Sequence, residues 1–411
     1  MNVLYVHRTQ GRGAEGAHIL GMFEALQHSG HRVSMVCPPG CDPVEQERAR
    51  TAFAGDDGGS PAPIGEDKIP PRRSPFRRAY SYLSDRAPQW FFEMLELGYN
   101  VPLLITLVWK CIRFRPDLVY ERYALHTFAC VLVCRTLGIP RVVEVNDSVV
   151  IERSRPLTFR ALATLLERFN LRSAALTVTI TERFRQLLEE RHGLSRNSTL
   201  VLPNAVSSRR SQGPFPREEL RKAWGLEGTV LGASGQFLPW HGIDALVSSL
   251  GPSAIERGLR FFFVGDGPAR GDIEAVAERL GIRDRVRFTG MVAITEVPRF
   301  LACLDIAVLP GVASHASPMK LMEYMAHGLP LVAVDVPSVR ALAGVEEAVL
   351  VPPGDTEALR RGVHDLLDHP DRARALGSAA RRAVLSHHTW DVRAQELMAA
   401  LRERGVRTAT A

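Results

Sequence analysis

Short apolar runs alternate with segments of helical periodicity along most of this chain, and this alternation constrains the fold more than any other feature. Residues 3–6 form an apolar run, residues 17–27 carry apolar side chains at helical spacing, and residues 32–37 form a second apolar run. A strand, a helix and a strand in this order predict a βαβ unit. Its repetition predicts an α/β fold with doubly wound parallel sheets that have helices on both faces.

The same pattern recurs in both halves of the chain. In the first half the further expected elements cover residues 118–120, 128–137, 141–145, 157–171, 176–180 and 182–190. In the second half they cover residues 230–234, 243–250, 260–264, 272–280, 286–288, 297–301, 306–309, 318–327 and 331–334. Two Rossmann-like domains follow from these two series.

The boundary between the domains is expected where the periodicity breaks. After Val201 the sequence Leu-Pro-Asn-Ala leads into the polar run 207–216. We therefore expect an N-terminal domain over 1–203 and a C-terminal domain over 204–385. Two segments fall outside this alternation. Residues 76–110, rich in aromatics and leucine at helical spacing, predict a helical insertion, and residues 386–411 predict a C-terminal helix that packs back towards the N-terminal domain.

Composition favours a soluble protein with reduced thiols. Hydrophobic residues make up 45% of the chain and charged residues 23%, and the six cysteines show no zinc-ligand spacing. The longest apolar stretches, 101–109 and 128–134, fall short of the ~18 consecutive residues that span a bilayer. The first residues lack the pattern of a secretory signal. We expect a cytoplasmic protein without a transmembrane helix.

The formal net charge of +6 is partly concentrated at Arg72, Arg73, Arg77 and Arg78. No nucleic-acid motif accompanies these arginines, so an anionic membrane surface or a phosphorylated ligand is favoured over DNA or RNA. Peripheral contact with the inner membrane face through the region from Arg72 to Arg78 is one interpretation. An ordinary solvated loop is the other.

A glycine-rich loop follows the first expected strand. Residues 11–16 read Gly-Arg-Gly-Ala-Glu-Gly, the spacing of a dinucleotide-binding loop. That motif expects an acidic residue about 20 positions later, where this chain has Cys37, Pro38 and Pro39. NAD binding is therefore not favoured. The glycines, Gly13 among them, either let a ligand approach the backbone or serve only a tight turn.

The segment 317–330 predicts one short helix with an anion site at its start. Ser317 is a suitable N-cap, Pro318 suits the first helical position, and Gly328 ends the helix. Lys320 would then lie in the first turn, where the helix dipole disfavours a cation unless an anion compensates. A bound phosphate would supply that anion. The alternative is a simple ion pair between Lys320 and Glu323 at i, i+3.

Two further loops follow expected strands at the edge where open α/β sheets bind ligands. Residues 234–242 contain Gly235, Gln236 and His241, and residues 264–268 contain Gly265. His241 could instead cap a helix, and Trp240 could serve packing alone.

The order of these segments resembles the retaining family-four glycosyltransferases, which have the GT-B fold: two Rossmann-like domains facing across a cleft that holds the donor. The matching stretches are 13–16, 30–31, 115–117, 138–140, 201–204, 235–242, 264–268, 288–290, 305–307 and 323–330. They cover nearly the whole chain in the expected order.

The resemblance implies residue roles. Glu323 matches the second of two paired glutamates and would bind the donor ribose, whereas the first would fall at His315. Gln236 and His241 stand where the family usually has arginine and lysine for the diphosphate. The Ser-Pro-x-Lys sequence ending at Lys320 resembles a variant branch of the family.

The implied site draws on both halves of the chain. Asn146 stands where family members often have histidine, and it cannot act as a base. The implied catalytic residues are Asn146, Asp147, Lys320 and Glu323. The implied donor-binding residues are Gly13, Gly235, Gln236, His241, Gly265, Met291, His315, Ser317, Pro318, Met319, Lys320, Leu321 and Glu323. No metal ligand set and no cofactor are expected.

The expected function is retaining, metal-independent transfer of a hexose from a nucleoside diphosphate sugar, UDP- or GDP-type, to a hydroxyl acceptor in polysaccharide or natural-product glycosylation. Two alternatives stay open. One is a sugar-nucleotide epimerase of the same architecture. The other is a degenerate sugar-nucleotide-binding partner subunit, which the missing arginine, lysine and first glutamate would suit.

Overall fold

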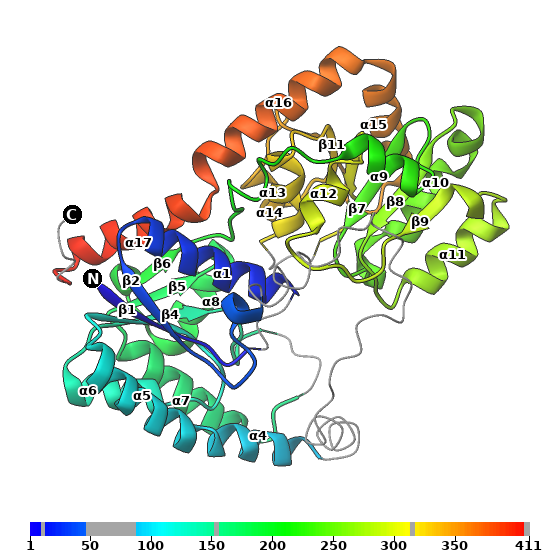
Figure 1. Cartoon of the computed structure of the whole chain (residues 1–411). Coiled ribbons are helices and arrows are strands. Elements are labelled where there is room, and N and C mark those ends of the chain that lie inside the picture. The colour runs from blue at the N-terminus through cyan, green and yellow to red at the C-terminus, as the bar shows by residue number, and fades with distance from the viewer. Residues whose placement is uncertain (10–12, 47–87, 152–155, 313–316, 407–411) are drawn as a thin grey trace. The chain divides into compact units, whose positions relative to one another are not determined.

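The computed structural model describes residues 1–9, 13–46, 88–151, 156–312 and 317–406 (Figure 1). These residues divide into two compact units. The N-terminal unit holds the described residues up to Pro203 together with those from Arg393 onward, and the C-terminal unit holds Asn204–Val392. Each unit is built on one parallel sheet of six strands.

The sheet of the N-terminal unit has the strand order β2-β1-β3-β4-β5-β6, with every pairing parallel. Its strands are β1 (Asn2–Val6), β2 (Arg32–Val36), β3 (Leu118–Arg122), β4 (Arg141–Val145), β5 (Leu176–Thr179) and β6 (Thr199–Val201). Its helices are α1 (Gly13–His28), α4 (Gln89–Gly98), α5 (Asn100–Phe114), α6 (Ala129–Leu137), α7 (Arg160–Arg172), α8 (Glu182–His192) and the short η1 (Arg196–Ser198). Helix α1 covers one face of the sheet, and α5, α6 and α7 cover the other (Figure 1).

The sheet of the C-terminal unit has the strand order β12-β11-β10-β7-β8-β9, again parallel throughout. Its strands are β7 (Val230–Ser234), β8 (Arg260–Val264), β9 (Val286–Phe288), β10 (Ile306–Leu309), β11 (Leu331–Val334) and β12 (Val349–Val351). Its helices are α9 (Arg217–Ala223), η2 (Pro239–His241), α10 (Ile243–Glu256), α11 (Arg270–Arg279), η3 (Arg283–Arg285), α12 (Val297–Leu301), α13 (Met319–Ala326), α14 (Pro337–Arg340), α15 (Thr356–Asp368) and α16 (Pro370–His387). The last helix, α17 (Trp390–Glu403), begins in this unit and continues in the N-terminal one.

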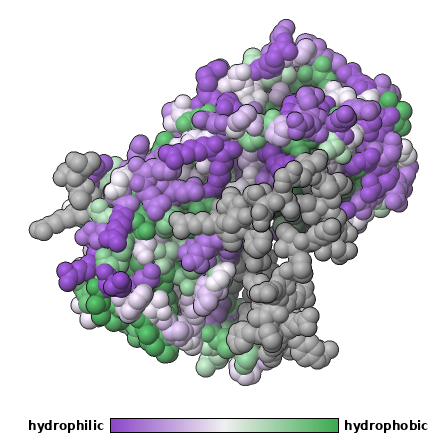
Figure 2. Space-filling view, viewed as in Figure 1, coloured by the Kyte–Doolittle hydropathy of each residue, from purple (hydrophilic) through white to green (hydrophobic). Residues whose placement is uncertain are grey.

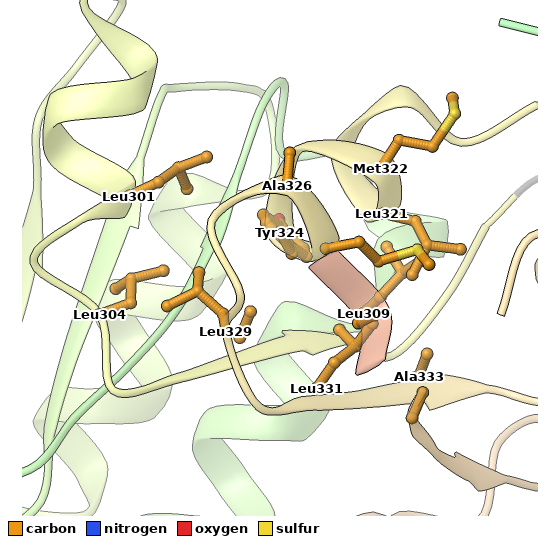
Figure 3. Close-up of a cluster of buried hydrophobic side chains, with 14 of the residues drawn as sticks. Leu301, Leu304, Leu309, Leu321, Met322, Tyr324, Ala326, Leu329, Leu331 and Ala333 are labelled. Atoms are coloured by element: carbon orange, nitrogen blue, oxygen red, sulfur yellow. The ribbon is translucent and has the colours of Figure 1, made fainter. Parts of the chain in front are cut away.

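A dense apolar core fixes α13 against the C-terminal sheet. Leu321, Tyr324 and Met325 are fully buried and pack with residues of β10 and β11 such as Leu309 and Leu331 (Figure 3). Leu301 and Leu304 close the cluster on the side of α12. Close packing of this kind leaves a helix little freedom to shift, so the polar side chains of α13 have fixed positions.

Two expectations are corrected by these boundaries. Helix α1 begins at Gly13 rather than at residue 17, so Gly13 and Gly16 are helical and not part of a loop. Helix α13 begins at Met319, one residue later than expected.

The expectation that the chain has no transmembrane helix stays a prediction. Residues Gln89–Phe114 form a helical stretch of 26 residues that is long and apolar enough, by length and composition, to cross a membrane. Counting consecutive apolar residues missed it because Glu93, Glu96, Lys110 and Arg113 interrupt the run.

Candidate functional site

The order of the C-terminal strands reverses between β7 and β10. The chain moves from β7 outward to β8 and β9, and then returns to the other side of β7 with β10. In open parallel sheets, ligands bind beyond the carboxyl ends of the strands at such a switch point. The loop after β7 and the residues that directly follow β10 therefore border the expected binding crevice of this unit.

Glycines let these loops approach one another closely. Gly265, with φ at +134°, packs so tightly on Gly235 that an added Cβ would lie 2.1 Å from its carbonyl oxygen. Gly311, after β10, packs on Trp240 in the same way, at 2.4 Å. Such distances exclude a side chain at Gly265 and at Gly311, so the loops after β7, β8 and β10 lie close together at this edge of the sheet. Gly265 was expected to bind the donor. Its close packing on Gly235 requires a glycine there even without a ligand.

Tyr324 ties α13 to the end of β7. Its hydroxyl accepts hydrogen bonds from Ser234 N at 2.6 Å and from Ser234 Oγ at 3.2 Å. The sequence reasoning did not single out Tyr324. Its position four residues after Lys320, on the buried side of a short helix, was the available signal.

The amine of Lys320 lies between α13 and the loop after β7. Its Nζ is 3.4 Å from Nδ1 of His241, and a Cβ added at Gly235 would lie 3.6 Å from it. Burial lowers the pKa of Lys320 to about 8, although nearby Glu323 opposes the shift. The structure thus brings together Lys320, His241 and Gly235 from the list of expected site residues.

His241 is neutral here and not the second cation that would replace an arginine or lysine. Burial, followed by the charge of Lys320, lowers its pKa to about 4. Its Nδ1 accepts a hydrogen bond from Leu238 N at 3.3 Å. An accepting Nδ1 assigns the ring proton to Nε2, which can donate to a ligand oxygen.

Glu323 lies on the same helix, partly buried. Burial raises the pKa of its carboxyl to about 7, against the opposing effect of Lys320. Among the ion pairs of the described residues, none joins Lys320 to Glu323. The i, i+3 pair considered as the alternative role for Lys320 is therefore not formed.

Ser317 does not cap α13. The N-cap position belongs to Pro318, and no side chain caps it. Ser317 is buried, and instead its Oγ accepts a hydrogen bond from Asn204 N at 3.2 Å while its carbonyl accepts one from Asn204 Nδ2 at 3.0 Å. These bonds anchor the start of α13 to the segment that opens the C-terminal unit. Leu321 N at the start of α13 donates to the carbonyl of Pro318 at 3.1 Å, and the N–H groups of Met319 and Lys320 precede the first intrahelical bond.

The remaining expected residues are more dispersed. Gln236 is exposed in the loop after β7, and Met291 is 74% exposed after β9. Met319 and Leu321 lie in the first turn of α13, with Leu321 buried in the core. His315 and the arginines from Arg72 to Arg78 lie outside the described residues.

In the N-terminal unit, Asn146 belongs to a buried network centred on Glu144. The Glu144 carboxylate accepts hydrogen bonds from Tyr120 Oη at 2.6 Å, from Arg122 Nη1 at 2.8 Å and from Asn146 Nδ2. Nε2 of His18 lies 2.9 Å from it. Burial alone would raise the pKa of Glu144, but His18 and Arg122 outweigh burial and hold the pKa well below its ordinary value.

This network gives Asn146 a fixed orientation that sequence reasoning did not foresee. One N–H of its amide donates to the Glu144 carboxylate, which orients the side chain at the end of β4. Asp147 follows directly at the end of β4.

Metal-binding clusters are not found in the part of the chain that the structure describes: no three His, Cys, Asp or Glu side chains there are grouped to hold an ion.

Comparisons with known proteins agree with this arrangement. Residues 13–205 match the family described as Glycosyl transferase 4-like domain, and residues 228–369 match Glycosyl transferases group 1. The chain belongs to the glycosyltransferases that combine these two domains.

A curated relative is the 2-deoxystreptamine glucosyltransferase of Streptomyces kanamyceticus. It is 30% identical over 291 residues, which cover 67% of this chain and 75% of the relative.

Solved structures show the GT-B fold. A glycosyltransferase from Rickettsia africae superimposes with a TM-score of 0.71 at 13% identity, covering 99% of both chains. Anabaena Alr3699/HepE in complex with UDP superimposes with a TM-score of 0.68 at 17% identity, covering 98% of this chain and all of the other.

Proposed function

We propose that this glycosyltransferase transfers a hexose from a nucleoside diphosphate sugar, UDP- or GDP-type, to a hydroxyl acceptor, with retention of configuration and without a metal. One observation carries the proposal: the amine of Lys320 is held beside Gly235 and His241 at the start of α13, at the switch point of the sheet. A cation, a donating imidazole and free helix N–H groups together form a site for a diphosphate.

The leaving diphosphate is the group that such a site stabilises. Lys320, with a pKa of about 8, is mostly protonated at neutral pH, and a bound phosphate would favour its charged form further. His241 would donate from Nε2, and the N-terminus of α13 would add its dipole. Donors placed where charge develops lower the barrier of the chemical step.

Glu323 is proposed to bind the ribose hydroxyls. A carboxyl whose pKa lies near 7 can accept a hydrogen bond when ionised and donate one when protonated. It adds at most a partial negative charge next to the diphosphate at neutral pH.

Retention is proposed to occur without an enzymatic nucleophile. Asn146 cannot take a proton at neutral pH. The departing diphosphate oxygen would therefore accept the proton of the acceptor hydroxyl on the same face of the sugar, while the bond from the anomeric carbon to the diphosphate breaks and the bond to the acceptor forms.

The test begins with a thermal-shift screen of the full chain against UDP, GDP, TDP and ADP and their sugars, because a ligand that binds only the folded state raises apparent stability. Donors that bind are then incubated with hydroxyl acceptors, beginning with 2-deoxystreptamine, which the Streptomyces relative glucosylates by name. The anomeric configuration of the product is read by NMR.

Three outcomes would contradict the proposal. An inverted product would contradict retention. An altered donor sugar formed without acceptor would favour the epimerase. Donor binding without transfer or hydrolysis across the acceptor panel would favour a binding subunit. Lys222→Met is the matched control for Lys320→Met in these assays, because Lys222 is exposed on α9, away from the switch point.

A further inference from the structure

Helices α4 and α5 expose a continuous apolar stripe. Within the helical stretch Gln89–Phe114, exposed apolar side chains recur about every turn. The stripe consists of Trp90, Met94, Val101, Ile105, Val108 and Ile112. Ile105 is 67% exposed and Ile112 is 72% exposed. Hydrophobic surface lies along the lower edge of the N-terminal unit in Figure 2, where Figure 1 places α5 and α6.

The opposite side of the same stretch is anchored in the unit. Leu103, Leu107 and Cys111 are buried against strands of the N-terminal sheet. Asn100 Oδ1 accepts hydrogen bonds from Phe128 N at 2.7 Å and Ala129 N at 3.0 Å. A helix held to its sheet in this way cannot leave it to cross a bilayer, so the exposed stripe fits a helix that lies in the plane of an interface.

Hydrogen bonds to the buried carboxylate of Glu93 hold α4 to the segment before α7. The Glu93 carboxylate accepts hydrogen bonds from Thr158 N at 2.6 Å and Phe159 N at 2.7 Å, just before α7. The guanidinium of Arg135 on α6 lies 5.8 Å over the ring of Phe169 on α7. Exposed Leu132 on α6 and Leu165 on α7 extend the apolar surface.

The charges on these four helices are of one sign at the surface. Their carboxylates are Glu93, Glu96 and Glu167. Glu93 and Glu167 are fully buried, and Glu96 pairs with Arg8 at 2.7 Å and with His126 at 2.8 Å. The basic residues are Lys110, Arg113, Arg135, Arg160, Arg168 and Arg172.

We propose that this face of α4, α5, α6 and α7 docks the protein on the surface of a lipid bilayer that contains anionic headgroups. Apolar side chains would enter the interface, arginines would contact the headgroup charge, and Trp90 and Trp109 would lie at headgroup depth. A second copy of the chain fits less well, because a two-fold contact of this face with itself would bring two surfaces of the same positive sign together. The proposal places a cytoplasmic protein at the membrane face through these helices, independently of the arginines from Arg72 to Arg78 and of the proposed reaction.

The test measures co-sedimentation of the full chain with vesicles of phosphatidylcholine alone and of phosphatidylcholine mixed with phosphatidylglycerol. Binding is expected to the mixed vesicles and to weaken as salt rises. The double variant Ile105→Ser and Ile112→Ser should bind about tenfold more weakly, because two apolar side chains no longer enter the bilayer. The control is the double variant Ile255→Ser and Val345→Ser, which removes side chains of similar exposure from the C-terminal unit and should bind as wild type does.

Absence of wild-type binding would overturn the proposal, as would an equal loss in both double variants. Wild-type dimers that the first double variant converts to monomers, without vesicle binding, would assign the face to a second copy. A second readout is quenching of tryptophan fluorescence by brominated lipid. Replacing Trp90 and Trp109 by Phe should abolish most of the quenching, whereas Trp240→Phe, at a tryptophan 60% exposed in the C-terminal unit, should not.

Discussion

Glu144 is buried and Glu323 is partly buried, and the groups around them have opposite effects on the negative charge. Glu144 receives hydrogen bonds from Tyr120 and Arg122 and lies beside His18, so its pKa stays well below the ordinary value. Within the described part of the chain, Lys320 is the opposing charge that acts on Glu323, and burial raises the pKa of Glu323 to about 7.

The two carboxylates differ in whether the protein supplies the hydrogen bonds and opposing charges that stabilise the ionised form. In the N-terminal unit the protein supplies every partner of the buried charge, which is how a structural carboxylate is stabilised. In the C-terminal unit the amine and the carboxyl have pKa values of about 8 and about 7. Perturbed pKa values at the ligand edge of a sheet are typical of functional sites.

The largest expected effect is on stability at Glu144. Glu144→Gln should lower the free energy of unfolding by about 3–5 kcal/mol, because the buried guanidinium of Arg122 would be left without its counter-charge. Urea denaturation checks this value. The control is Asp335→Asn, which removes the partner of the exposed Arg340 and should have a much smaller effect, because solvent screens an exposed ion pair. Equal small losses would show that the Glu144 network contributes little.

The next effect is on activity at Lys320. Lys320→Met should lower kcat/KM by about 10- to 150-fold, since losing a hydrogen bond to a charged group costs about 1.5–3 kcal/mol. The Tm of the ligand-free protein should barely fall or should rise, because burial of the charged amine opposes folding. Unchanged activity with a lower Tm would make Lys320 a structural residue, and the proposed diphosphate site would be wrong.

A smaller effect is expected in the pH dependence of Glu323. Its raised pKa means that its contribution to stability is present at low pH and is lost as the pH rises to about 7. The pKa of Lys320 is lowered, so the contribution of Lys320 to stability is present at high pH and is lost as the pH falls through about 8. Glu323→Gln should therefore stabilise the ligand-free protein more at about pH 8 than at about pH 5, by about 1–2 kcal/mol.

Glu144 provides the contrast for this experiment. Its lowered pKa means that its contribution is present above the ordinary carboxyl range and is lost only as the pH falls below it. The stability loss of Glu144→Gln should therefore be similar at about pH 5 and about pH 8. If the effect of Glu323→Gln on stability is equally independent of pH, Glu323 is a structural carboxylate like Glu144.

The smallest expected effect is that of a chelator. We expect turnover to be the same with and without EDTA, because Lys320 and the N-terminus of α13 are proposed to supply the charge that a metal ion would otherwise supply. The check is the initial rate before and after chelation, followed by added magnesium or manganese. A rate that falls with EDTA and recovers with either ion would contradict the metal-free mechanism.

The sequence predicted the strands of the C-terminal unit closely. Strands β7, β8 and β10 have the bounds expected from their apolar runs, because buried parallel strands are apolar on both faces. The position of Lys320 near the loop after β7 also followed from local patterns, since both segments end at the same edge of the sheet.

Contacts between distant residues explain what the sequence missed. Ser317 was expected to cap α13, but it bonds Asn204, 113 positions away. The role of Glu144 depends on Tyr120 and His18, which no local pattern connects with it. A count of consecutive apolar residues did not detect the stretch Gln89–Phe114, because charged residues interrupt the run in the sequence. The exposed apolar side chains recur instead with the helical period.

Helix α17 has a consequence for synthesis on the ribosome. Leu397 and Leu401 are buried, Arg404 donates to the carbonyl of Asn197 at 2.9 Å, and the residues from Arg393 onward belong to the N-terminal unit. The N-terminal unit therefore lacks its last helix until the residues from Arg393 onward have been made, by which point Asn204–Val392 is already complete. While the C-terminal unit is being made, the apolar surface that α17 covers in the N-terminal unit stays exposed. Exposed apolar surface of this kind binds chaperones and promotes aggregation.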